Sequence, residues 1–129
     1  MALTKTIKGI IGACLTPFED NDRIDYRALE KEMDFLIGDC DAVTIAAVEA
    51  AEYTMLSREE RKELLKIGTQ IVDKRVPVIL GCSSPSPREV IDLAEYAATI
   101  GGDFVQVMVF AYVVFRLPAD CAGVLGIPA

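Results

Sequence analysis

The sequence has 129 residues, of which 52% are apolar and 26% are charged, so it is long enough to form one globular domain with a sizeable core. It carries 20 acidic against 13 basic residues, a formal net charge of −7 and an isoelectric point near 4.5. This acidic balance lacks the basic surface that nucleic-acid binding requires, and it disfavours anionic membrane surfaces. The composition therefore predicts neither a nucleic-acid partner nor a membrane partner.

The sequence contains no recognisable targeting segment and no metal-binding motif. No apolar run approaches the ~18 residues that span a bilayer, and no apolar h-region follows the basic residues near the start. We therefore expect a cytoplasmic protein. Histidine is absent, and the four cysteines lie too far apart for paired metal ligands, so we expect reduced thiols and no metal site. They are Cys14, Cys40, Cys82 and Cys121.

The first part of the chain predicts a strand, a helix and a second strand. Residues 10–15 form a short apolar run, as do residues 42–48. Between them, residues 26–37 place apolar side chains at helical spacing. Asp25 is the expected N-cap of this helix, and Gly38 is expected to end it.

The second part of the chain repeats this pattern. Ser57 and Glu60 form a capping box that starts a second helix. Residues 76–80 form a third apolar run, and Ser86 is the expected N-cap of a third helix. A fourth apolar run covers residues 104–110.

The four apolar runs do not alternate with polar residues, which is typical of parallel strands covered by helices. The order is strand–helix repeated three times and then a strand, which fits either a doubly wound sheet or half of a (β/α)8 barrel. The connection at 16–24 contains no glycine, so it lacks the phosphate-binding turn of nucleotide-binding sheets. Glycine and proline in residues 121–129 disfavour a fourth helix there, which indicates an incomplete unit.

Four motifs resemble one known family in order and spacing. They are Gly9-Ile10-Ile11-Gly12-Ala13-Cys14-Leu15-Thr16-Pro17-Phe18, Ile24-Asp25, Leu56-Ser57-Arg58-Glu59-Glu60-Arg61 and Pro77-Val78-Ile79-Leu80-Gly81. The family is that of dihydrodipicolinate synthase and N-acetylneuraminate lyase, and the resemblance covers about residues 7–120. It implies an α/β fold that is the N-terminal half of a (β/α)8 TIM barrel, with about four parallel strands and three helices. Residues 1–129 are then one partial barrel domain, with an atypical tail at 121–129.

The resemblance also implies the activity of a class I lyase or aldolase. In this family pyruvate or a related 2-oxo acid forms a Schiff base with a lysine near the end of strand six. A tyrosine at the end of strand four relays protons. The amine turns the ketone into an iminium, which stabilises a carbanion at the neighbouring carbon. The implied ligand is a small 2-oxo acid, and neither a metal nor a separate cofactor is implied.

The family motif that holds the substrate carboxylate falls on a divergent segment of this chain. The glycine-threonine-threonine-glycine-glutamate of the family corresponds to Val48-Glu49-Ala50-Ala51-Glu52. By resemblance, Glu49, Ala50, Ala51 and Glu52 are the candidate substrate-binding residues. Both hydroxyls are missing and Glu49 adds a negative charge, so we expect altered substrate specificity.

Two residues are candidates for the catalytic role. Tyr112 stands where the family has proline-tyrosine-tyrosine after strand four, and a buried aromatic residue at the barrel rim is the alternative. Thr16 closes the first strand at the carboxyl edge, where barrels build their sites, and a simple turn with Pro17 is the alternative. After the third run, Ser83 and Ser84 either bind an anion or form the turn.

No lysine of this sequence corresponds to the Schiff-base position. All six lysines precede the third predicted strand: Lys5, Lys8, Lys31, Lys62, Lys66 and Lys74. We therefore interpret the chain as a family member truncated before the catalytic lysine and inactive by itself. Two alternatives are a non-catalytic or partner-dependent half-barrel and an autonomous doubly wound binding domain. A half-barrel exposes strand edges and apolar faces, which predicts self-association.

Overall fold

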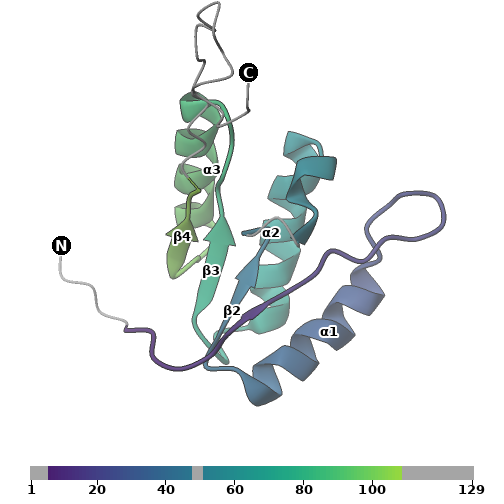
Figure 1. Ribbon diagram of the computed structural model, residues 1–129, viewed down its shortest axis with the longest axis vertical. Coiled ribbons are helices and arrows are strands. Elements are labelled where there is room, and N and C mark those ends of the chain that lie inside the picture. Colours follow the sequence, from purple (N-terminus) through teal and green to yellow (C-terminus); the bar gives the residue numbers. More distant parts are fainter. Residues whose placement is uncertain (1–5, 48–50, 109–129) are drawn as a thin grey trace, which may run out of the picture.

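The computed structural model describes residues 6–47 and 51–108, which form one sheet with helices beside it (Figure 1). Within these described residues, four strands and three α-helices alternate, as predicted. They are β1 (Ile11–Ala13), α1 (Tyr26–Asp39), β2 (Ala42–Ile45), α2 (Arg58–Val72), β3 (Val78–Gly81), α3 (Pro87–Thr99) and β4 (Phe104–Gln106). Among the described residues, no helix has the length and apolar character needed to cross a membrane.

The strands are shorter than the apolar runs that predict them. β2 ends at Ile45 because Ala46 adopts a left-handed backbone with φ of 50°, which does not fit a strand. β3 begins after Pro77, which has no N–H to donate to a neighbouring strand. β4 ends at Gln106, and residues 109 and 110 of the predicted run lie outside the described residues.

The helix boundaries confirm some expected signals and correct others. Asp25 caps α1, since its carboxylate accepts hydrogen bonds from the backbone N–H groups of Arg27 and Ala28. The prediction that Gly38 ends this helix is wrong, because α1 continues through it to Asp39. Gly38 does not adopt a left-handed φ, so its backbone does not interrupt the helix.

The starts of α2 and α3 use serine differently. Ser57 and Glu60 form the predicted capping box, with each side chain bonded to the other residue's backbone N–H. Ser86 precedes α3 as predicted, but within the described residues its side chain makes no capping hydrogen bond. Instead, the Ser84 hydroxyl accepts from the Ser86 N–H at 3.1 Å and donates to the Glu89 carboxylate at 2.5 Å.

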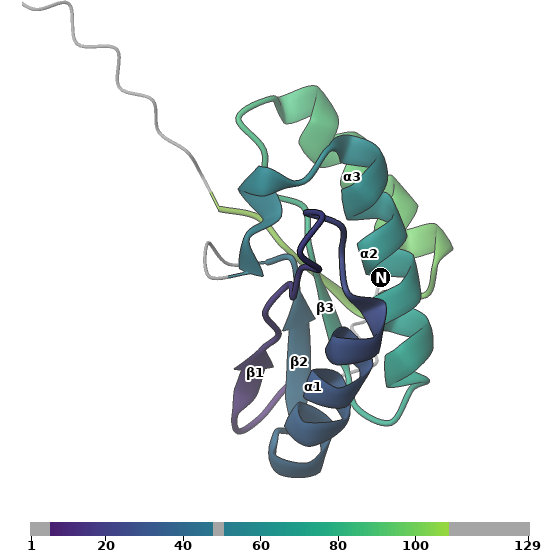
Figure 2. The same ribbon diagram turned by 90° about the vertical axis from the view of Figure 1, so that its right-hand side faces the viewer.

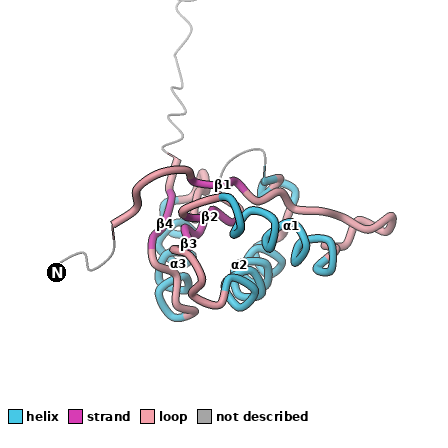
Figure 3. Tube along the Cα trace, turned by 90° about the horizontal axis from the view of Figure 1, so that it is seen from below, coloured by secondary structure: helices cyan, strands magenta, loops and turns pink. Residues whose placement is uncertain are grey.

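The strand order decides between the two architectures. All four strands are parallel, and each pairs with its neighbour in the sequence, in the order β1-β2-β3-β4. The three helices lie on one side of the sheet (Figures 2 and 3). A doubly wound sheet instead has its first strand in the interior and helices on both faces. The described residues therefore form part of a (β/α)8 barrel, and the doubly wound alternative is wrong.

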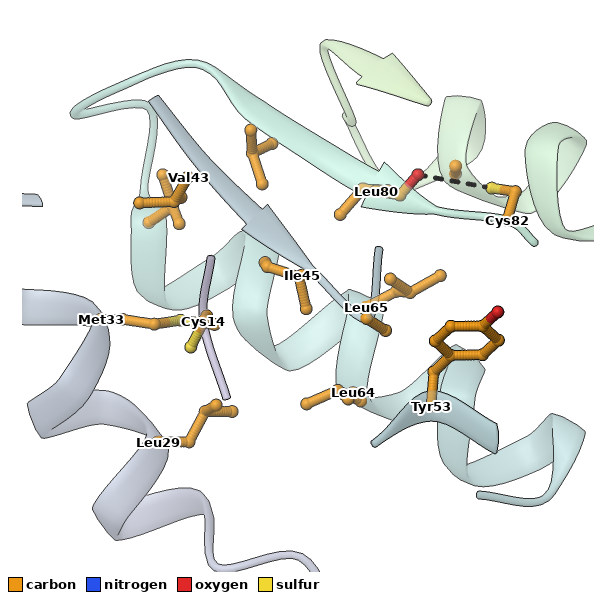
Figure 4. Close-up of a cluster of buried hydrophobic side chains, with 14 of the residues drawn as sticks. Cys14, Leu29, Met33, Val43, Ile45, Tyr53, Leu64, Leu65, Leu80 and Cys82 are labelled. Atoms are coloured by element: carbon orange, nitrogen blue, oxygen red, sulfur yellow. Dashed lines mark hydrogen bonds between the residues drawn. The ribbon is translucent and has the colours of Figure 1, made fainter. Parts of the chain in front are cut away.

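The hydrophobic core lies between the helices and the outer face of the sheet (Figure 4). Val43 and Ile45 of β2 and Leu80 of β3 are buried there. They face buried residues of the helices: Leu29, Met33, Leu64, Leu65 and Leu93. Gly68 of α2 permits close packing, because a Cβ there would lie 2.6 Å from the Ile45 Cδ1 atom. Each such side chain contributes about 1.5–3 kcal/mol when fully buried.

The inner face of the sheet is only partly covered. Alternation along β1 places Ile11 and Leu15 on this face, and both side chains are exposed. Thr44 of β2 also lies on it, since its neighbours Val43 and Ile45 face the core. Its hydroxyl is buried and has no hydrogen-bond partner among the described residues. A closed barrel would bury this face.

Candidate functional site

The candidate site lies at the edge where the parallel strands end. The segments that follow β1, β2 and β3 meet at this carboxyl edge, where (β/α)8 barrels place their sites. In the described residues these segments include Thr16, residues 51–53 and residues 82–84. Each of them is fixed by a hydrogen bond to another part of the chain.

Thr16 joins the end of β1 to the segment after β2. It is buried, its hydroxyl donates to the Ala51 carbonyl at 2.6 Å, and its backbone N–H donates to the Glu52 carboxylate at 3.1 Å. The structure thus brings together three of the predicted site residues. Because the Thr16 proton is already donated to Ala51, the hydroxyl supports the loop rather than pointing freely at a ligand.

Glu52 occupies a strained position at the end of this segment. Its backbone is left-handed, with φ of 52° and ψ of 18°, a conformation uncommon for residues other than glycine. A 3₁₀ turn, Tyr53–Met55, follows it, and the Glu52 carbonyl accepts from the Met55 N–H at 2.9 Å. With the bond from Thr16 to its carboxylate, Glu52 is held at both its backbone and its side chain.

Arg61 is a buried cation at this edge that sequence analysis did not single out. Its side chain reaches from α2 to the end of β3, where Nη1 donates to the Ser83 carbonyl at 2.9 Å and Nη2 to the Gly81 carbonyl at 3.2 Å. The guanidinium lies 4.8 Å from the centre of the Tyr53 ring. Arg61 therefore ties α2, β3 and the turn after β2 together.

The environment of Arg61 is electrostatically unusual. It is only 4% exposed, and desolvation lowers the pKa of its guanidinium from the usual value, partly opposed by the negative charge of Glu89. The Arg61 Nε and the Tyr53 hydroxyl have no hydrogen-bond partner among the described residues. Arg61 and Tyr53 are among the residues that line a hollow of about 250 Å³. The sequence signal for this burial is that Arg61 precedes Leu64, Leu65 and Gly68 at helical spacing, on the face of α2 that packs on the sheet.

Ser83 and Ser84 fix the end of β3 to its surroundings. Ser83 is fully buried, and its hydroxyl accepts from the Met108 backbone N–H at 2.9 Å, which links β3 to the segment after β4. The Ser84 hydroxyl bonds to Ser86 and Glu89 as described above. Both serines therefore serve local structure, which supports the turn interpretation over direct anion binding.

Three predicted site residues lie outside the described residues. Glu49 and Ala50 belong to the loop 48–50, and Tyr112 follows residue 108. Their roles stay predictions. The described residues on either side of this loop, Ala47 and Ala51, are both fully buried.

The buried cysteines at this edge are neutral thiols. Burial, together with the negative charge of Glu32, raises the pKa of Cys14 to about 12, and burial raises the pKa of Cys82. A thiol with a raised pKa is a poor nucleophile, because the thiolate is the reactive form. Among the described residues, no group of three or more carboxylate or thiol side chains is arranged to hold a metal ion.

Comparison with known proteins identifies the family to which this chain is similar. The family model of the dihydrodipicolinate synthetase family matches residues 6–116. This chain belongs to that family. It is 43% identical over 102 residues to a 4-hydroxy-tetrahydrodipicolinate synthase of Rickettsia bellii, covering 78% of this chain and 34% of that protein. The chain thus spans about a third of the length of the curated relatives that it matches.

Solved structures of family members share the fold. A putative dihydrodipicolinate synthetase from Pseudomonas aeruginosa matches with a TM-score of 0.80 and 28% identity, covering 86% of this chain and 38% of that chain. YagE of E. coli K12, solved in complex with pyruvate, matches with a TM-score of 0.78 and 29% identity, covering 83% of this chain and 36% of that chain. These matches confirm the family resemblance and the partial-barrel fold predicted from the sequence.

Proposed function

We propose that this chain supplies the carboxylate-binding edge of a class I lyase or aldolase that acts on pyruvate or a related 2-oxo acid. The observation that carries the proposal is the pair of hydrogen bonds from Thr16 to Ala51 and Glu52, which fixes one end of the loop 48–50. Family membership supports the reaction class. The similarity to YagE, whose structure contains pyruvate, supports the substrate class.

In this proposal the loop after β2 binds the substrate carboxylate through backbone N–H groups. The family's two threonine hydroxyls are replaced by Glu49 and Ala50, so the remaining donors are the N–H groups of Ala50 and Ala51. A carboxylate at Glu49 repels a bound carboxylate by about several kcal/mol if both are desolvated. We therefore expect this segment to bind the carboxylate of a 2-oxo acid more weakly than the family motif does, with altered specificity.

The reaction requires a lysine amine. Its attack on the ketone carbon forms an iminium and releases the carbonyl oxygen as water, after which the iminium stabilises the neighbouring carbanion. Every lysine of this sequence precedes β3, so in this proposal the amine belongs to a part of the barrel that the 129 residues do not contain. The 129-residue polypeptide is then inactive by itself. Tyr112 is the proposed proton relay.

We also propose a reducing, cytoplasmic location. Cys14, Cys40 and Cys82 are all free thiols in the structure, which is usual for proteins of a reducing compartment.

The test of the proposed function is a covalent chimera. Residues 6–116 of this chain replace the matching segment of the Rickettsia bellii synthase, and the remainder of that protein supplies the rest of the barrel. Incubation with a panel of 2-oxo acids that includes pyruvate, followed by borohydride reduction and mass spectrometry, is expected to show a stoichiometric adduct on a lysine outside residues 6–116.

Two comparisons make this test decisive. The 129-residue polypeptide alone is expected to form no adduct with any acid of the panel. A chimera that melts cooperatively but traps no 2-oxo acid would contradict the proposal, as would an adduct on Lys62 or Lys66 of this chain.

A further inference from the structure

One serine side chain extends the pairing of β3 with β4. Among the described residues, the last backbone hydrogen bond between these strands runs from the Cys82 N–H to the Gln106 carbonyl, at 2.9 Å. Alternate residues of a strand present their backbone groups to the same neighbouring strand, so Met108 faces β3 as Gln106 does. The Met108 N–H donates to the Ser83 hydroxyl at 2.9 Å. A side chain therefore holds the chain just beyond the end of β4.

Ser83 is itself held in place by two helices. It is 0% exposed, and its carbonyl accepts from the Arg61 Nη1 of α2 at 2.9 Å. The next residue, Ser84, donates its hydroxyl proton to the Glu89 carboxylate of α3. Because α2 and α3 both hold this short segment, the Ser83 hydroxyl is a fixed point to which Met108 is attached.

The chain that Ser83 holds leads to the proposed proton relay, since Tyr112 follows Met108 by four residues. We propose that Ser83 is a positioning residue for Tyr112 and acts through its hydrogen bond to Met108. This inference rests on the proposed function, because it takes Tyr112 as the proton relay. Ser83 does not contact the substrate in it. A misplacement of about 1 Å in a reacting group can slow a reaction about 100-fold, so one hydrogen bond at this point affects the rate.

The two buried hydroxyls of this edge then have different tasks. Thr16 donates to the Ala51 carbonyl and so supports the segment after β2, where the substrate carboxylate is proposed to bind. Ser83 accepts from Met108 and supports the segment after β4. Loss of the Thr16 hydroxyl is expected to weaken binding, whereas loss of the Ser83 hydroxyl is expected to slow proton transfer while binding is retained.

The test uses the chimera described above and the 2-oxo acid of the panel that it traps best. In heavy water a base removes a proton from the carbon next to the iminium, and a deuteron from the solvent returns to that carbon. NMR measures this exchange without a second substrate. Ser83→Ala is expected to lower the exchange rate at saturating acid about tenfold or more, and to leave the half-saturating concentration within about twofold.

A second substitution shows whether Ser83 acts through Tyr112. Tyr112→Phe removes the phenol hydroxyl but keeps the ring. In the Tyr112→Phe chimera, adding Ser83→Ala is expected to change the exchange rate by less than about twofold, because the group that Ser83 positions is already absent. A purely structural effect of Ser83→Ala would lower the rate by the same factor in both backgrounds.

Two further variants serve as controls. Ser86→Ala is the matched control, because among the described residues the Ser86 side chain makes no capping hydrogen bond. It is expected to leave the exchange rate within about twofold. Ser83→Cys nearly preserves side-chain size but is a weaker acceptor, so it is expected to lower the rate in the same direction as Ser83→Ala. If Ser83→Ala does not unfold cooperatively in urea, the same comparisons are made with Ser83→Cys.

Three results would overturn the inference. The first is an equal exchange rate for folded Ser83→Ala and Ser86→Ala chimeras. The second is an equal fractional loss from Ser83→Ala with and without Tyr112→Phe. Both leave trapping by the unchanged chimera intact, so the proposed function would stand. The third is a cooperatively folded, unchanged chimera that traps no 2-oxo acid, which contradicts the proposed function and this inference together.

Discussion

The Thr16 hydroxyl donates a 2.6 Å hydrogen bond to the Ala51 carbonyl and so joins two segments that lie 35 residues apart in the sequence. The bond is buried, and the N–H of the same residue bonds to the neighbouring Glu52. One residue at the end of β1 thus holds Ala51 and Glu52 of the segment that follows β2. We therefore expect Thr16 to act as a positioning residue, and its loss is measurable in two ways.

Thr16→Val in the chimera is expected to lower the free energy of unfolding by about 1–3 kcal/mol, because it leaves the buried Ala51 carbonyl without its donor. It is also expected to raise KM for the trapped 2-oxo acid more than it lowers kcat, since the loop that binds the carboxylate loosens. Urea titration and steady-state kinetics measure the two effects. Thr99→Val is the control, because the Thr99 hydroxyl bonds only within α3 to the Tyr96 carbonyl. Equal KM values for both variants would show that Thr16 does not position the loop.

Arg61→Met is expected to destabilise the chimera by about 2 kcal/mol or more. The change preserves side-chain bulk but leaves the carbonyls of Gly81 and Ser83 without donors in a buried setting. Arg58→Met is the matched control, since Arg58 pairs with Asp92 at the surface and surface pairs contribute little. Urea melts are expected to give a clearly lower free energy of unfolding for Arg61→Met than for Arg58→Met. If they coincide, the buried contacts of Arg61 do not stabilise the edge.

Stability is expected to fall as the pH rises from about 9 towards 12, with part of the loss due to Cys14. Burial and the nearby Glu32 raise the pKa of this thiol from 9.0 to about 12, so the unfolded chain loses the proton first. Between these two pKa values the folded state holds the Cys14 proton and the unfolded state does not. The free energy of unfolding therefore falls as the pH rises through this range. Urea melts across this pH range are expected to show that the free energy of unfolding declines less steeply with pH for Cys14→Ala than for the unchanged chimera. Cys40→Ala is the control, and identical slopes for all three proteins would refute the assignment.

Replacing Glu49 and Ala50 together by threonine is expected to improve pyruvate binding by the chimera. The change removes a like charge from the loop and adds two hydroxyl donors for the substrate carboxylate. Calorimetric titration with pyruvate measures the affinity. An affinity that stays equal or weakens would show that the family motif does not fall on residues 48–52.

The 129-residue polypeptide alone is expected to form a dimer or an aggregate rather than a stable monomer. Ile11 and Leu15 near the inner face, Val105 of β4 and Val107 after it are exposed apolar side chains. Contiguous exposed apolar surface favours association. Light scattering with a urea melt and an apolar dye distinguishes the cases. A monodisperse 14.0 kDa monomer that unfolds cooperatively and binds no dye would contradict the expectation.

The order of the elements follows from local sequence signals. Runs without alternation indicate strands buried on both faces, and the capping box at Ser57 starts α2 where expected. The sequence predicts that Thr16, Ala51 and Glu52 lie at the same edge of the sheet, because they follow parallel strands. It does not predict that they are in contact. Their hydrogen bonds depend on side-chain geometry that no sequence pattern specifies.

The features that sequence analysis missed depend on tertiary contacts. Gly38 does not end α1, because the helix continues where no left-handed turn is imposed. Ser86 does not cap α3 with its side chain; instead, the Ser84 hydroxyl bonds to the Ser86 N–H and to the Glu89 carboxylate. Arg61 is buried with its donors bonded to the carbonyls of Gly81, the last residue of β3, and of Ser83 just after it; β3 begins 17 residues after Arg61. Such partners are set by packing, which overrides the local preference of a charged residue for solvent.

The sequential strand order also governs how this unit folds. Because β1 pairs with β2, β2 with β3 and β3 with β4, each pairing closes a single strand–helix–strand segment and needs no distant part of the chain. Such local pairings reduce the loop-closure entropy that slows the folding of parallel sheets. The sheet can therefore grow one strand at a time as the chain leaves the ribosome, with the newest edge always the one that receives the next strand.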